Sequence, residues 1–118
     1  MELPEPKQEG LNPKDFVGTV FKCRISFSDI WKDCVLKEDL KSKNDREYSK
    51  YHLRILKDGQ HTTLAYLWDN QLSEVMKTYG IKTELWTNMP IEVTALEQGK
   101  YFIWVIKPCE EFDIDVKV

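Results

Sequence analysis

The sequence predicts an all-β domain with one helix, and three observations carry this prediction. Five segments of the chain have strand patterns: four alternate apolar and polar residues with the period of two that is typical of half-buried strands, and the fifth is a short apolar run. One amphipathic run, residues 72–79, lies between the third and fourth of these segments and has the spacing of a helix. Asp58 and Gly59 lie between the second and third segments, and an Asp-Gly dipeptide in this position strongly predicts a hairpin. At 118 residues with 42% hydrophobic content, the chain is long enough to bury one core.

The first predicted strand is followed by the part of the chain with the weakest pattern. Residues 16–27 alternate as a strand whose outward face carries Lys22 and Arg24. Residues 28–36 fit either one face of a short helix or, at their end, a strand extension. Residues 37–50 are almost all charged or polar, which predicts a long exposed loop.

The second predicted strand, residues 51–57, pairs with the third through the hairpin at its end. The third strand ends in two aromatic residues, Tyr66 and Trp68, which share its outward face. Ala65 and Leu67 then share the inward face. This alternation predicts that the two rings point away from the core.

The helix and the last two strands complete the order. Asp69 or Asn70 is a suitable N-cap for the helix, and Gly80 is a suitable end. The fourth predicted strand covers residues 89–96 and the fifth covers residues 101–106, with a tight turn between them.

The two ends of the chain differ in composition from its middle. Residues 1–15 hold three of the five prolines, which predicts an extended arm. Residues 16–108 form the predicted domain. Residues 109–118 alternate acidic and apolar residues, as either an edge strand or a detached acidic tail would.

The order of the predicted elements indicates the architecture. Five strands with a single helix between the third and fourth is the order of the OB-fold, a five-stranded Greek-key barrel. Gly18, early in the first strand, would allow the bend that a barrel strand needs. The same order also allows an α+β antiparallel sheet with one covering helix.

Composition narrows the class of protein. Three cysteines at wide spacings argue against a disulfide framework and for a reducing, cytoplasmic setting. No apolar run approaches the roughly 18 residues of a membrane span, so no membrane partner is expected. The net charge is −3, but residues 22–57 hold ten Lys or Arg against six Asp or Glu, so positive charge gathers in the first half of the chain.

The residue patterns that would carry catalysis or hold a cofactor are missing from the sequence. His52 and His61 have no ligand-like spacing to each other or to a cysteine, so we expect surface strand residues and no metal site. The five glycines are scattered and form no phosphate loop, and no serine or cysteine lies in a nucleophile context. We therefore expect neither an enzyme nor a cofactor.

Aromatic and basic residues predict a binding function instead. Four tryptophans and five tyrosines are more than a small core buries, even with Trp104 expected in the core because its strand is very apolar. Beside Tyr66 and Trp68, the outward faces of the first two strands carry basic residues: Lys22, Arg24 and Arg54. Bases stack on exposed rings and phosphates pair with cations, so this surface predicts single-stranded nucleic acid as the partner. The alternative is that the two rings pack beneath the loop at residues 28–50 or beneath the tail.

The run from Leu64 to Asp69 alternates and ends in tryptophan followed by a polar residue. It is similar to the third strand of the single-OB-fold single-stranded DNA-binding proteins of the replication protein A type, which the strand order over residues 16–107 also resembles. The resemblance implies a role in DNA replication and a base-stacking platform at Trp68. Tyr101, near the hairpin of the last two strands, is the nearest match to a second platform. The long first loop and the acidic net charge depart from the family.

A protein-binding role is the second hypothesis. The net charge of −3, the acidic C-terminal residues and the spare tryptophans would suit an adaptor, or a subunit or inhibitor from a virus or mobile element. In that case a sheet edge or the C-terminal tail would add a strand to the partner.

Overall fold

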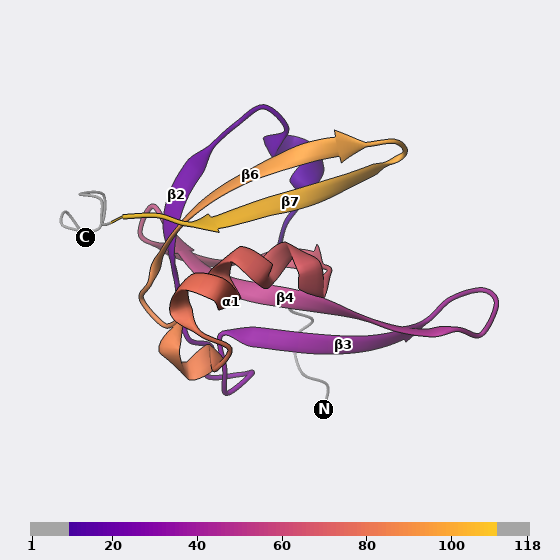
Figure 1. Ribbon diagram of the computed structural model, residues 1–118, viewed down its shortest axis with the longest axis horizontal. Helices are drawn as coiled ribbons and strands as arrows, with labels where there is room; N and C mark the ends of the chain where they lie inside the picture. The colour runs from indigo at the N-terminus through magenta and orange to yellow at the C-terminus, as the bar shows by residue number, and fades with distance from the viewer. Residues whose placement is uncertain (1–9, 111–118) are drawn as a thin grey trace.

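The chain folds into one sheet with an α-helix and short 3₁₀ helices, as the computed structural model describes for residues 10–110 (Figure 1). The strands are β1 (Gly10–Leu11), β2 (Phe21–Ile25), β3 (Val35–Lys41), β4 (Glu47–Lys57), β5 (Gln60–Leu67), β6 (Pro90–Gln98) and β7 (Tyr101–Pro108). The helices are η2 (Pro13–Phe16), η3 (Asp69–Leu72), α1 (Ser73–Tyr79) and η4 (Thr83–Leu85). None of the helices in this part of the chain is long and apolar enough to cross a membrane. The prediction of a mostly β architecture with one α-helix is confirmed.

The sheet has the order β1-β5-β4-β2-β6-β7, and β3 adds to β4. β1 pairs with β5 in parallel, and the other neighbouring pairs are antiparallel. The described residues therefore contain seven strands where five were predicted, because β1 and β3 were not expected. Figure 1 shows the β3–β4 and β6–β7 hairpins projecting in the same direction, with α1 between them in this view.

β4 pairs with more strands than any other described strand does. One of its edges pairs with β5, and the other pairs first with β3 and then with β2. Between β2 and β3 the chain leaves the sheet as the 26–34 loop, and both ends of this loop bond the same residue of β4. The Ser26 amide donates to the Arg54 carbonyl (2.9 Å), and the Arg54 amide donates to the Cys34 carbonyl (2.8 Å). β2 and β3 therefore act as one interrupted strand along β4.

The prediction of a long exposed loop at residues 37–50 is wrong. Residues 37–41 lie in β3 and residues 47–50 lie in β4, so only the turn at residues 42–46 leaves the strands. The alternative of a strand extension at residues 34–36 agrees with the start of β3. Lys37, Asp39 and Lys41 are exposed on this edge strand, and charged residues are a common protection for a sheet edge. In the sequence, such a strand looks like a loop.

The two predicted hairpins are confirmed. β4 and β5 are joined at Asp58 and Gly59, whose φ angles of 53° and 79° are both left-handed, as a two-residue hairpin turn requires. β6 and β7 pair up to Gln98 and Tyr101. The predicted helix is also present, and the amide of its C-cap, Gly80, donates to the Met76 carbonyl (3.0 Å).

The N-terminal part of the described chain packs on the sheet. Of the predicted arm, residues 10–11 lie in β1 and residues 13–15 lie in η2. The ring of Phe16 contacts those of Phe21 and Trp104, with centroids 5.2 and 5.7 Å away. The predicted first strand is too long, because residues 16–20 make a turn in which the Thr19 amide donates to the Phe16 carbonyl (3.1 Å). Residues 1–9 of the arm and 111–118 of the predicted tail lie outside the described residues.

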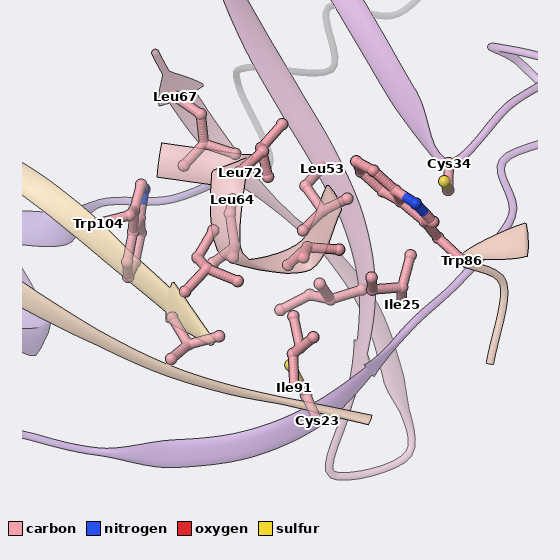
Figure 2. Packing of buried hydrophobic residues seen from close by; sticks show 14 of the residues in the cluster. Cys23, Ile25, Cys34, Leu53, Leu64, Leu67, Leu72, Trp86, Ile91 and Trp104 are labelled. Carbon is pink, nitrogen blue, oxygen red and sulfur yellow. The ribbon is translucent and has the colours of Figure 1, made fainter. Parts of the chain in front are cut away.

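The hydrophobic core lies between the sheet and α1, and two buried tryptophans flank its aliphatic residues (Figure 2). Trp104 and Trp86 are 1% and 2% exposed, so the prediction of Trp104 in the core is confirmed. Each indole has a hydrogen-bond partner. Trp86 Nε1 donates to the Gly80 carbonyl (2.8 Å), and Trp104 Nε1 donates to the Ala65 carbonyl (3.1 Å). The second of these bonds joins β7 to β5, which have three strands between them in the sheet order.

Replacing Trp104 by phenylalanine should test this link. Trp104→Phe keeps an aromatic ring in the core but removes the donor from a buried carbonyl, which costs about 1–3 kcal/mol, and it also leaves a small cavity. We expect the free energy of unfolding in urea to fall by at least this amount. A loss well below 1 kcal/mol would contradict a structural role for the bond.

The three thiols should differ in reactivity. Cys23 and Cys34 are each 1% exposed, and burial raises the pKa of both thiols to about 12. Both should stay protonated and unreactive at pH 8, whereas the half-buried Cys109 should react. A thiol-specific disulfide reagent should therefore detect one cysteine in the native protein and all three in denaturant. Rapid reaction of a second cysteine in the native protein would contradict this burial.

Candidate functional site

A groove of about 730 Å³ lies between the end of β5 and the β6–β7 hairpin. Residues 10–13 form part of its wall. The aromatic and basic side chains that line it come from three places in the chain: Lys50 from β4, Tyr66 and Trp68 from the end of β5, and Lys100, Tyr101 and Phe102 from the β6–β7 hairpin. The groove therefore brings exposed rings and cations together from distant parts of the chain.

A β-bulge in β5 turns the two predicted aromatic residues toward this groove. β4 has one residue between Tyr51 and Leu53, whereas β5 has two residues between their partners, Leu67 and Leu64. The extra residue shifts the alternation, so Leu64 and Leu67 both enter the core although they are three positions apart. Without the bulge, Tyr66 would share the inward face with Leu64.

The conformation of Tyr66 is what makes the bulge. Its φ angle of 63° is left-handed, which is strained for a residue with a large side chain. Tyr66 and Trp68 are 44% and 40% exposed, so the prediction that they point away from the core is confirmed. Ala65 and Leu67 are 3% and 0% exposed, so the prediction that both are buried is confirmed, although Ala65 also borders the floor of the groove. Backbone strain held at an exposed ring is typical of functional positions.

The outward face of β4 supports these two rings. Lys50 Nζ lies 4.6 Å from the Trp68 ring centroid and 5.6 Å from that of Tyr66. The Tyr48 ring lies 5.9 Å from Trp68, and the His52 ring lies 5.4 Å from Tyr66. Partial burial among these rings lowers the pKa of Lys50. Sequence reasoning missed Tyr48 and Lys50 because it assigned them to a loop, although Tyr48, Lys50 and His52 follow one another at intervals of two, which is a strand signal.

Tyr101 forms the opposite side of the groove. It is 74% exposed at the start of β7, directly after Lys100 in the hairpin turn. The three predicted aromatic residues, Tyr66, Trp68 and Tyr101, therefore line one groove. Lys100 was not predicted, and its place beside Tyr101 in a tight turn was the available signal.

The three predicted basic residues do not line the groove. Lys22 and Arg24 lie on β2, which β4 separates from β5 in the sheet order. Arg24 Nη1 donates to the Asn88 carbonyl (2.7 Å), which holds this guanidinium against the connection before β6. Arg54 is half-buried on β4, opposite Thr63 of β5. Lys50 and Lys100 are instead the cations that the groove brings next to its rings.

The two histidines lie in different surroundings. His52 is 1% exposed, so the expectation of a surface histidine is wrong there; its Nε2 lies 2.9 Å from Glu38 Oε1 on β3. His61 is exposed, as expected, and its Nδ1 lies 3.2 Å from Ser26 Oγ. Among residues 10–110, no three His, Cys, Asp or Glu side chains gather as a metal ion would need.

Comparisons with known proteins provide no relative for this chain. No family model matches it, and neither a curated protein nor a solved structure matches it significantly. A function for the groove therefore has to be argued from its own geometry.

The strain at Tyr66 can be measured by substitution. Tyr66→Gly and Tyr66→Val both remove the ring, and in an ordinary strand valine is favoured over glycine by up to about 1 kcal/mol. At a left-handed φ the order should reverse, with the glycine variant more stable in urea by about 1 kcal/mol or more. Val105 in β7 is a control, since Val105→Gly should destabilise as in a regular strand. A more stable Tyr66→Val protein would show that the bulge is not strained.

Proposed function

We propose that this chain binds single-stranded nucleic acid in the groove, with single-stranded DNA as the first ligand to test. Tyr66, Trp68 and Tyr101 stack the bases, while Lys50 and Lys100 pair with phosphates. The observation that carries the proposal is the convergence of three well-exposed rings, at 40% to 74% exposure, on one groove with two lysines. The proposed function is binding alone, without a catalytic step.

The strand order supports an OB-like architecture for this proposal. With β2 and β3 taken as one interrupted strand, β5-β4-β2-β6-β7 with a helix between β5 and β6 has the order of a five-stranded Greek-key barrel. OB-fold proteins bind oligonucleotides on the face of their second and third strands and at the loop between the fourth and fifth. In this chain those elements are β4, β5 and the β6–β7 turn, which border the groove.

Stacking on rings held by strands explains why a single strand is the expected ligand. An unpaired base exposes a flat π-face, and each base stacked on an aromatic side chain contributes about 1–3 kcal/mol. In a duplex these faces are covered by neighbouring base pairs. Because every base has such a face, little sequence preference is expected.

Local charge rather than net charge has to attract the phosphates. The whole chain carries a net charge of −3, which weakens long-range attraction of a nucleic acid. Lys50 and Lys100 lie in the groove itself, where short-range pairing with phosphates persists. Binding should therefore be moderate and should weaken with added salt.

Protein binding is the second candidate function. Ile30, Ile81 and Leu85 are 56%, 80% and 56% exposed, and β7 pairs along one edge only among the described strands. Exposed apolar side chains and a sheet edge are what an added strand from a partner uses. The three exposed apolar side chains do not line the groove, whereas the start of β7 borders it, so the two features do not form one surface and support the second candidate less directly.

Substitution of Trp68 tests the nucleic-acid proposal. Trp68→Ala should weaken binding of a labelled oligo-dT, measured by fluorescence anisotropy at low salt, by about 5- to 150-fold because one stacked base is lost. Phe27→Ala is a matched control, since Phe27 is 46% exposed but lies on the 26–34 loop away from the groove. This control should bind as the wild type does.

A second variant separates the stacking ring from the fluorescence signal. Trp68→Phe should still bind oligo-dT but lose most of the quenching of intrinsic fluorescence. Of the three tryptophans that remain, Trp86 and Trp104 are buried, and the half-buried Trp31 lies on the 26–34 loop outside the groove. Quenching of the wild type should fade with salt. A folded wild-type protein that neither binds nor is quenched at low salt would remove the proposal and favour the protein-binding candidate.

A further inference from the structure

Lys50 lies in the groove without a carboxylate partner in the described part of the chain. Several other lysines have one, such as Lys57 with Asp58 and Lys77 with Glu74. Across the ladder from Lys50, Glu38 lies with its carboxylate 2.9 Å from His52 Nε2. The ammonium of Lys50 is instead in contact with two aromatic rings.

This placement leaves the Lys50 ammonium partly desolvated and available to an anion. Burial lowers the pKa of Lys50, which reports that its charged form has lost water contacts. Ring π-faces compensate a cation for part of that loss, and phosphate oxygens compensate it better because they carry a full charge. The groove therefore contains a lysine whose best partner is not supplied by the described chain.

The same placement also covers the rings. Lys50 Nζ lies 4.6 Å from the Trp68 centroid and 5.6 Å from the Tyr66 centroid, within the range of a cation–π contact for both. A base that stacks on the ring face covered by Lys50 needs the volume that this ammonium occupies. Stacking and the present position of Lys50 exclude each other wherever they share a ring face.

We propose that Lys50 leaves the Trp68 and Tyr66 rings when bases stack on them, and that its ammonium then binds a backbone phosphate of the same strand. This inference rests on the proposed function and assigns Lys50 as the residue that couples stacking to phosphate binding. The flexible stem of lysine allows the ammonium to move while the β4 backbone stays in place. A ligand with bases but no phosphate would uncover the rings without giving Lys50 an anion, and it should bind poorly.

The position of Lys50 can be followed directly by NMR. Reductive dimethylation with ¹³C-formaldehyde keeps the positive charge and gives every lysine a methyl signal; the Lys50→Arg protein identifies the signal of Lys50. In the free protein, ring currents from Trp68 and Tyr66 should shift this signal upfield. Addition of oligo-dT should move it downfield, toward the signal of Lys77, whose side chain is 74% exposed on α1. The Lys77 signal should not move.

Tryptophan fluorescence in the same samples separates the possible outcomes. Quenching by oligo-dT with an unmoved Lys50 signal would overturn this inference and leave the proposed function in place. Absence of both changes would overturn both. If the free protein shows no upfield shift of the Lys50 signal, Lys50 does not lie on the rings and the inference is overturned. It is also overturned if inorganic phosphate at matched ionic strength moves the signal as far as oligo-dT does, because stacked bases would then not be what moves Lys50.

A charge-removing variant gives an independent measurement. Lys50→Met keeps an apolar stem but cannot pair with phosphate, so the slope of log affinity against log salt should be smaller by about 0.7, the value for one phosphate of a single strand. Lys77→Met is the matched control and should keep the wild-type slope. An unchanged slope in Lys50→Met would contradict phosphate binding by Lys50.

Discussion

The hydrogen bond from Trp104 Nε1 to the Ala65 carbonyl is the interaction on which the groove depends. It joins β7 to β5 across an opening that the sheet ladder does not close, with the two atoms 3.1 Å apart. Because Ala65 lies within the bulge, the bond fixes the bulge and the two sides of the groove at once. The buried indole therefore links the side of the groove that carries Tyr66 and Trp68 to the strand that carries Tyr101.

The bulge shows how a single additional residue can separate stability from binding. Leu64 and Leu67 fill the core on either side of it, so the sheet loses no apolar burial where the alternation changes. The left-handed backbone of Tyr66 costs about 1–3 kcal/mol, which a core of this size can offset. What the chain gains is two large rings on a rigid strand end, facing the solvent. A loop could present the same rings only with greater conformational freedom.

Much of the fold was predictable because its signals are local. The hairpin at Asp58, the end of α1 at Gly80 and the exposure of Trp68 each follow from a few neighbouring residues. β3 was missed because a charged edge strand has the composition of a loop, and Lys50 was missed with it. Lys22 was placed near the rings because the sequence does not show that β4 separates β2 from β5. The site thus depends on strand pairing, which local patterns do not reveal.

The 26–34 loop leaves and re-enters the sheet at one residue, Arg54, whose amide and carbonyl bond its two ends. The register of β2 and β3 on β4 is therefore independent of how many residues lie between Ser26 and Cys34. Additional residues in this loop would therefore leave the register of the two strands, and with it the groove, in place. The same property makes it a suitable place to insert a peptide tag or a reporter domain.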